Sequence, residues 1–449
     1  MTGEILIENG VVITMNSAAE ILADSSLLID GPTIAAIGPR ADLRRRYPGA
    51  LRIDAAGKAV LPGLINAHTH VAMSLQKGTT LAVPNGLYRI MWPIEKSLTA
   101  ADVYTGALAG AAEALLCGST TIVDHYFHAD QVARAAMAVG VRGVIGHTIM
   151  SRLGPITGAS ELDAGLRFVQ EWRGRHPTIH PLLAPHASDT VSREWLLQLR
   201  AAATREGVGL HLHLAQSPLE HSYVRETYGT SCVRYLDEIG FLGPDVLAAH
   251  CIFIDEEEMD ILARRGVYAI YCPMGHALGG KPARAWEMLG RGTQVLLGTD
   301  CVTSNNVMDQ LGELRIAGAC QKQLTGDPQA MPARKILEMA TVQAAAAIGM
   351  GGKLGVLAPD YLADIILVDM RGLHTAPNYS ILDNLVYCCS GRDVHTVIVN
   401  GEIVVEAGHL LKLAEHTLVE AVEKTGRELL RRAVEKEPDL AWLWQERGG

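Results

Sequence analysis

The sequence predicts an α/β fold, a (β/α)8 TIM-like barrel with a small β-sandwich domain built from both ends of the chain. Three observations support this prediction. Apolar, β-branched runs alternate with segments of helical spacing over roughly 240 residues, the length of such a barrel. Strand-like sequence precedes and follows this region. Residues able to bind a metal end several of the runs, where barrel enzymes carry their catalytic groups. A doubly wound parallel sheet is the competing topology.

The ends of the chain are predicted to close on one another as the second domain. Residues 1–60 form the first part of the sandwich, 61–355 the barrel, and 356–449 the second part followed by a C-terminal helix. The last stretch has helical periodicity with mixed charges, which is typical of a helix on the surface of a barrel or against a second subunit. Turn signals between the sandwich strands are Asn9-Gly10, Asp30-Gly31 and Asn400-Gly401.

Eight strands are expected in the barrel. The glycine-rich segment GMGGKLG at 349–355 has no strand before it, and Leu354 replaces the third glycine of a dinucleotide motif, so we expect a connector there. The expected strands are 60–67, 119–124, 141–148, 180–186, 208–214, 245–250, 267–272 and 294–299.

Composition narrows the classes of partner. The net charge of -10 disfavours a nucleic-acid polymer or an anionic membrane as partner. No apolar run reaches the ~18 residues of a membrane span, and the start lacks a signal peptide, so a cytoplasmic protein is expected. The 8 cysteines form no C-x-x-C pair, which indicates reduced thiols. A small molecule is the expected partner.

Five metal-competent residues stand at or just after predicted strand ends. His68 and His70 are two residues apart, so both imidazoles can face one ion. His211 also shares a strand face with His213, and spacing alone leaves open which of these two binds. Imidazoles with one carboxylate suit zinc, iron or another divalent transition metal. The five residues are His68, His70, His213, His250 and Asp300.

The motifs PGLINAHTH, HLHLAQ, AAHC and GTD, in this order, resemble the amidohydrolase superfamily, in particular the branch of methylthioadenosine/S-adenosylhomocysteine deaminases and triazine hydrolases. The likeness covers nearly the whole chain. It implies one divalent ion, zinc first, with His250 beside the metal-bound water. The carboxylated lysine that bridges two metals in other branches has no counterpart between Lys96 and Lys281. The implied ligands are His68, His70, His213 and Asp300.

The resembling deaminases carry a glutamate three residues after the strand-5 histidine, and this chain has Gln216 there. An amide neither takes nor gives a proton near pH 7, whereas a departing amine needs one. Glu220, one helical turn further on, is the first candidate to replace the glutamate, with a solvated helix face as its competing role. Alternatively, the leaving group needs no proton, or the glutamine is an inactivating change. The remaining candidate proton sources are Glu95, Asp189 and His276.

Further departures concern the substrate. Gly275 and His276 replace a serine and an asparagine usual in the family, and His147 stands where members that take S-adenosylhomocysteine have an arginine. Only Arg152 is nearby, so that substrate is not expected. For the histidines, a buried structural role competes with substrate contact, and it is the expected role of His125. The predicted substrate contacts are Trp92, His128, His147, His186, His276 and Asn305.

Three functions follow. The first is hydrolytic deamination of a small aminated heterocycle, such as a purine, pterin, pyrimidine or triazine, by metal-activated water. The second is hydrolysis by the same groups of a C–N, C–S or C–Cl bond of a triazine, urea, carbamate or thiocarbamate without ammonia release. The third is a catalytically weak binding protein. The resemblance also suggests a homodimer or larger homo-oligomer, for which the C-terminal AWLWQ offers apolar area.

Overall fold

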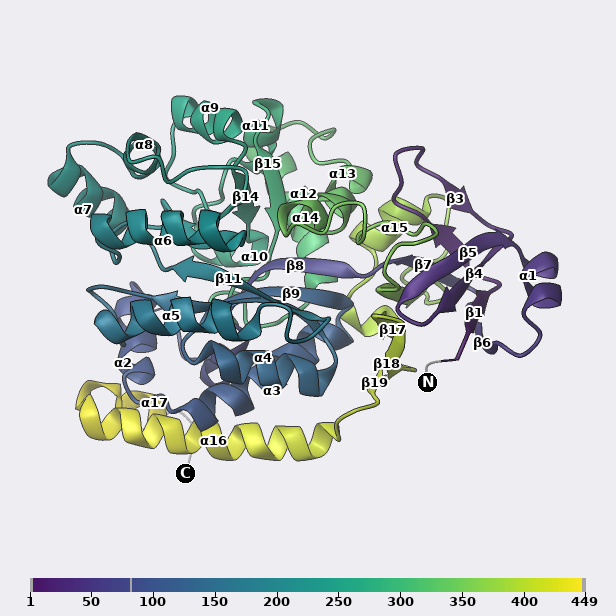
Figure 1. Cartoon of the computed structure of the whole chain (residues 1–449), viewed down its shortest axis with the longest axis horizontal. Coiled ribbons are helices and arrows are strands. Elements are labelled where there is room, and N and C mark those ends of the chain that lie inside the picture. The colour runs from purple at the N-terminus through teal and green to yellow at the C-terminus, as the bar shows by residue number, and fades with distance from the viewer. Residues whose placement is uncertain (1–2, 81–82, 446–449) are drawn as a thin grey trace.

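The computed structural model describes residues 3–80 and 83–445. Its centre is an eight-stranded parallel sheet in the order β15-β14-β13-β12-β11-β10-β9-β8 (Figure 1). A bridge between Thr69 and Asp300 joins the two outer strands and closes the sheet into a barrel. The strands are β8 (Leu64–Thr69), β9 (Ser119–Tyr126), β10 (Arg142–Ile149), β11 (Ile179–Pro185), β12 (Leu210–Leu214), β13 (Val246–His250), β14 (Tyr268–Tyr271) and β15 (Gln294–Leu297).

Helices pack around this barrel because their apolar faces cover the outward side chains of the strands. The C-terminal glycines of several helices allow the chain to turn back into the next strand, for example Gly140 after α4. The helices are α3 (Ala100–Leu116), α4 (Ala129–Val139), α5 (Ala159–Trp172), α6 (Arg193–Glu206), α7 (Pro218–Tyr228), α8 (Cys232–Glu238), α9 (Glu256–Arg265), α10 (Pro273–Leu278), α11 (Ala285–Gly290), α12 (Gln310–Thr325), α13 (Ala333–Met339) and α14 (Val342–Ala347).

One predicted strand was wrong. The run 60–67 belongs to two strands, because β7 (Lys58–Pro62) pairs outside the barrel and β8 starts at Leu64. Gly63 joins them at a place where a Cβ would lie 2.1 Å from the Thr120 side chain, so the close approach requires glycine. Both strands are buried on both faces, so no alternation of apolar and polar residues separates them, and Pro62-Gly63 is the sequence signal that stands at the break.

Two further sheets contain strands from the chain ends, as predicted. A four-stranded sheet is ordered β5-β4-β1-β6, and a seven-stranded sheet is ordered β19-β18-β17-β16-β7-β2-β3. Their facing sides share one apolar core. The strands are β1 (Ile5–Glu8), β2 (Val11–Ile13), β3 (Ile21–Leu22), β4 (Ser25–Asp30), β5 (Thr33–Pro39), β6 (Leu51–Asp54), β16 (Ile365–Asp369), β17 (Val394–Val399), β18 (Glu402–Glu406) and β19 (His409–Leu410), with helices α1 (Arg40–Arg46) and α15 (Ile381–Tyr387).

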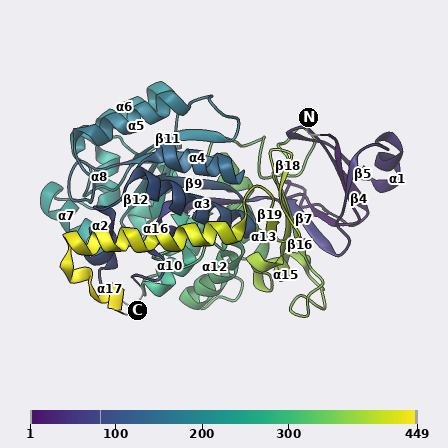
Figure 2. The same ribbon diagram turned by 90° about the horizontal axis from the view of Figure 1, so that it is seen from below.

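The long helix α16 (Glu415–Lys436) lies along the barrel beside α3 (Figure 2). Leu429 and Leu430 pack against Ile90 and Ile94, so this helix supports the segment that carries α2 (Trp92–Glu95). A short helix α17 (Trp442–Gln445) follows. No helix of the described ranges is long and apolar enough to cross a membrane.

A buried ion pair links the barrel to the sheet built from the chain ends. Arg142 on β10 donates to both carboxylate oxygens of Asp364, at 2.9 and 2.8 Å, and both residues are inaccessible to solvent. Arg142→Met is expected to destabilise the protein by about 3–5 kcal/mol because it leaves the Asp364 charge buried without its partner. Thermal unfolding measures the loss. Arg173→Met, at the exposed pair with Glu206, is the control and should cost less than about 1 kcal/mol.

Candidate functional site

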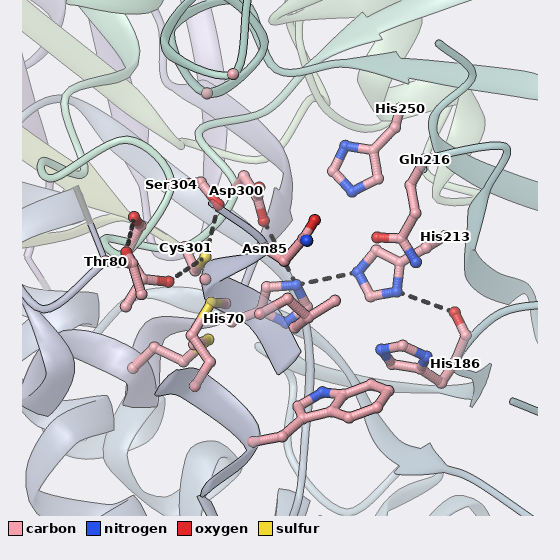
Figure 3. A pocket seen from close by; sticks show the side chains of 18 of the residues that line it. His70, Thr80, Asn85, His186, His213, Gln216, His250, Asp300, Cys301 and Ser304 are labelled. Carbon is pink, nitrogen blue, oxygen red and sulfur yellow. Dashed lines mark hydrogen bonds and ion pairs between the residues drawn. The ribbon is translucent and has the colours of Figure 1, made fainter. Parts of the chain in front are cut away.

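A cavity of about 700 Å³ opens at the carboxyl ends of the barrel strands (Figure 3). One side is polar and carries a group of histidines together with Asp300. The other side is apolar. The apolar wall comprises Met73, Val83, Pro84, Leu87, Met91, Trp92, Phe127, Met150, Ile252, Phe253 and Leu278.

His70 and His213 face each other across the polar side, with their Nε2 atoms 3.2 Å apart. The Nδ1 of His70 lies 2.7 Å from the carbonyl oxygen of His125, and the Nδ1 of His213 lies 2.9 Å from that of His186. A carbonyl only accepts, so each Nδ1 carries the proton and each neutral ring presents a bare Nε2 lone pair to the other. Two facing lone pairs at this distance repel unless a cation lies between them.

His68 completes this arrangement. Its Nε2 is buried, has no hydrogen-bond partner in the described chain, and lies 3.4 Å from Oδ1 of Asp300. Its Nδ1 lies 2.9 Å from Nε2 of His211. His211 therefore stands behind His68, whereas His213 stands beside His70. Metal-binding histidines commonly have such a partner on the second nitrogen.

Asp300 lies among these rings. Burial would raise the pKa of its carboxyl, but the nearby imidazoles of His68, His250 and His70 hold it well below the usual value. Burial lowers the pKa of His68 to about 3, so its ring is neutral and its lone pair is free. Asp300 and His250 both have a positive φ, 61° and 80°. Residues other than glycine rarely adopt such a backbone angle, and those that do cluster at functional sites.

The donor set fits a divalent transition metal. Ligand atoms of His68, His70 and His213 lie within 4.8 Å of one another, and a second such group joins His68 to His250 and Asp300. Neutral imidazoles with one carboxylate suit zinc or a neighbour in the same series. His125 joins the first group with an unpartnered, buried Nε2, although the sequence favoured a structural role for it. Its Nδ1 contacts Thr148 at 3.1 Å, so it also has a structural partner.

Gln216 lines the cavity, whereas Glu220 is not among the described residues that do. The solvated helix face expected as the alternative for Glu220 was wrong, because the residue is fully buried. Its Oε1 accepts from Ser188 at 2.6 Å and its Oε2 from the backbone N–H of Gln216 at 2.8 Å. One oxygen thus holds the loop after β11 and the other holds the backbone of Gln216, which gives Glu220 a supporting position.

Burial raises the pKa of Glu220 to about 7, and Asp189 raises it further against the hydrogen bond from Ser188. A carboxyl whose pKa rises from 4.5 on folding contributes stability that is complete below pH 4.5 and is lost as the pH rises through 7. Glu220→Gln keeps both contacts, since the amide can donate to Ser188 and accept from Gln216. We expect the variant to lose less thermal stability between pH 5 and pH 8, by at most about 3 kcal/mol. An equal loss in both proteins would contradict this assignment.

The other candidate proton sources lie in different places. Glu95 and His276 line the cavity, and Asp189 is not among the described lining residues. Burial raises the pKa of Glu95 to about 7, although Tyr126, which donates to its Oε1 at 2.6 Å, lowers it. His276 lies next to His250, with its Nε2 3.1 Å from Nδ1 of His250.

Of the predicted substrate contacts, Trp92, His186 and His276 line the cavity. The other three, His128, His147 and Asn305, are absent from the described wall. His147 pairs with Glu161 at 2.9 Å, and Asn305 donates to Glu313 at 2.6 Å. The His147 ring and the amide nitrogen of Asn305 therefore have partners within the protein, whereas Oδ1 of Asn305 has none among the described residues. His128 directly precedes α4 and has a positive φ of 53°.

Most residues of the apolar wall were not identified from the sequence. These residues come from the segment before α2, which includes a π-helix at Leu87–Met91, and from loops around Phe253 and Leu278. Trp92 is the one predicted contact at this part of the wall. Loops have no periodicity that marks which side chain will face a cavity.

Comparisons with known proteins agree with this geometry. The model of the amidohydrolase family matches residues 59–404, and a short bacterial imidazolonepropionase-like composite domain matches residues 27–50. A 5'-deoxyadenosine deaminase of Methanosarcina mazei is 37% identical, over 96% of this chain and 99% of that protein. A 5-methylthioadenosine/S-adenosylhomocysteine deaminase of Pelotomaculum thermopropionicum is 36% identical, over 95% and 99%.

Solved structures with a similar fold include two zinc-containing hydrolases. An adenosine deaminase from Xanthomonas campestris with bound zinc superposes with a TM-score of 0.91 at 28% identity, covering 95% of this chain and 98% of that one. An atrazine chlorohydrolase from Arthrobacter aurescens complexed with zinc has a TM-score of 0.82 at 25% identity, covering 94% and 100%.

Proposed function

This chain belongs to the amidohydrolase family, and from that premise we propose that it catalyses the hydrolytic deamination of an aminated purine carried by a nucleoside. The observation that carries the proposal is the pair of bare Nε2 atoms of His70 and His213, 3.2 Å apart beside Asp300 on the wall of a cavity. The names of the deaminases similar to this chain support the purine.

Four side chains would hold the metal: His68, His70, His213 and Asp300. Zinc is the ion we propose, because it suits three imidazoles and a carboxylate and is bound in the related adenosine deaminase. When bound, such an ion supplies a water molecule that is activated for attack at neutral pH. The carbonyl groups of His125 and His186 fix which ring nitrogen of His70 and of His213 is bare, and His211 contacts the Nδ1 of His68.

The proton steps fall to His250 and Asp300, which lie together at the metal-facing side of the cavity. The neutral ring of His250 and the ionised carboxylate of Asp300 can take the proton of the attacking water. The amide of Gln216 can orient a ring nitrogen by hydrogen bonding but cannot protonate it. His276, in contact with His250, is the nearest further group that could share the proton, and Glu220 is not proposed for this role.

The apolar wall favours a nucleoside with an uncharged 5' substituent. Lys281 is the only lysine or arginine among the described lining residues, and its ammonium lies over the Phe253 ring, 4.7 Å from the ring centre. Arg152 stacks on Tyr223 instead, 4.1 Å from its ring centre. A charged amino-acid tail would therefore meet few partners. We propose 5'-deoxyadenosine or 5'-methylthioadenosine ahead of S-adenosylhomocysteine.

Ammonia release from metal-replete protein tests the function. The panel contains 5'-deoxyadenosine, 5'-methylthioadenosine, S-adenosylhomocysteine, pterins, aminopyrimidines and aminotriazines, and metal content is measured in the same sample. We expect release from the first two that disappears on chelation, with kcat/KM at least about tenfold lower for S-adenosylhomocysteine. No ammonia from any member, in protein with one metal per chain, would overturn the proposal.

Gln216 favours a second candidate function, the hydrolysis of a bond whose leaving group needs no proton. Carbamates, ureas, thioethers and chlorinated triazines form the corresponding panel, and release of thiol, halide or a substituted amine without ammonia would support it.

For the chain as a whole we propose cytoplasmic location and assembly into a homo-oligomer. Trp442, 37% exposed on α17, offers apolar area for such contacts, and sedimentation measures the assembly.

A further inference from the structure

A second cluster of metal-binding atoms includes His250 but none of the four proposed metal ligands. Ligand atoms of His250, Cys272 and His276 lie within 4.8 Å of one another. His250 ends β13, Cys272 follows β14 directly, and His276 lies one turn further on in α10. The backbone N–H of His276 donates to the carbonyl of Cys272 at 3.0 Å, so this turn holds the thiol and the imidazole on the same side.

The cluster is buried, and hydrogen bonding does not fully satisfy it. Exposure is 7% for His250, 0% for Cys272 and 5% for His276. A neutral imidazole has one proton, and the Nδ1 of His276 has no partner anywhere in the described ranges. The 3.1 Å between Nδ1 of His250 and Nε2 of His276 is close to the about 3.3 Å that separates two nitrogens on one tetrahedral zinc ion. An ion can therefore replace the proton between these rings with little movement.

We propose that His250, Cys272 and His276 form a second cation site, selective for thiophilic divalent ions such as Zn²⁺, Cd²⁺ or Co²⁺. A thiol with two imidazoles selects soft or borderline ions over Mg²⁺ and Ca²⁺. On binding, the Cys272 thiol gives its proton to solvent and its thiolate bonds to the ion, while the proton between the two rings moves to the other nitrogen of its own ring. The cavity side, lined by His250 and His276, leaves a position for water.

Occupation of this site is inhibitory. His250 belongs both to this cluster and to the group with His68 and Asp300. An ion held by His250 fixes that ring and occupies a lone pair that proton transfer requires. This consequence rests on the proposed deaminase function, whereas the binding site does not.

Cobalt titration of chelated protein tests the binding site without any substrate. We expect two Co²⁺ per chain, and the second should carry the near-ultraviolet absorption of a thiolate-to-cobalt transition, because the four ligands of the first site contain no sulfur. Cys272→Ser should keep the first Co²⁺ and lose the absorption, with at least about tenfold weaker binding of the second ion. Cys232→Ser, at another buried cysteine outside the cluster, is the control and should behave as the unaltered protein.

His276→Asn provides an independent second variant and should also lose the second ion. Absence of thiolate absorption in the unaltered protein, or its persistence in a folded Cys272→Ser protein, would overturn the site; the His250–His276 contact would then be an ordinary hydrogen bond. With an active substrate in hand, excess Zn²⁺ should inhibit the unaltered protein at concentrations at least about tenfold lower than Cys272→Ser. If no substrate is turned over, the cobalt result still decides the site.

Discussion

His213→Ala is expected to lower kcat/KM by on the order of 10⁴-fold or more and to reduce bound metal well below one equivalent per chain. The variant removes one of the two bare Nε2 atoms that face each other at 3.2 Å. Without this ligand the remaining side chains hold the ion poorly and the activated water is lost. Metal analysis and ammonia release on the same sample measure both effects.

His211→Asn is the matched control, since the two histidines lie on the same face of β12. His211 contacts His68 Nδ1 and not the ion, so we expect only about 10–100-fold weaker metal binding. A larger effect of His211→Asn on metal content would reverse the assignment of the two residues.

Gln216→Glu is expected to raise kcat for deamination by about 10²-fold or more, within the 10²–10⁴-fold range of a positioned acid–base group. The introduced carboxylate can carry the proton of the attacking water to the ring nitrogen and the departing amine, which the amide cannot do. KM should change much less than kcat, because the side chain keeps its size. Steady-state ammonia release across pH measures the gain.

Gln216→Met serves as the control, because methionine keeps the volume of the side chain and has no group that can transfer a proton. We expect no gain from it. If Gln216→Glu gave no gain with any amine substrate while halide or thiol release proceeded, the second candidate function would replace deamination. The pH profile adds a separate readout, since the new carboxyl should introduce an acidic limb absent from the unaltered protein.

The proton source shows where sequence reasoning reached its limit. Gln216 could be identified by its spacing from His213, but the best substitute by helical spacing, Glu220, turned out to be buried with both oxygens occupied. His276 looked like a change in the pocket wall, and the fold brings it to 3.1 Å from His250. Distance along a helix predicts a shared face, whereas the loop before α7 decides which way that face points.

The sequence by itself determined the class of barrel, the family, and the ordered histidines and aspartate at the strand ends, because strand period and motif order are local properties of the chain. Only the tertiary structure placed His213 beside His70 and His211 behind His68, left His128, His147 and Asn305 off the described cavity wall, and brought Cys272 and His276 to His250. These outcomes depend on which side chains from separate strands and loops meet across the barrel, and on which polar groups already satisfy one another there.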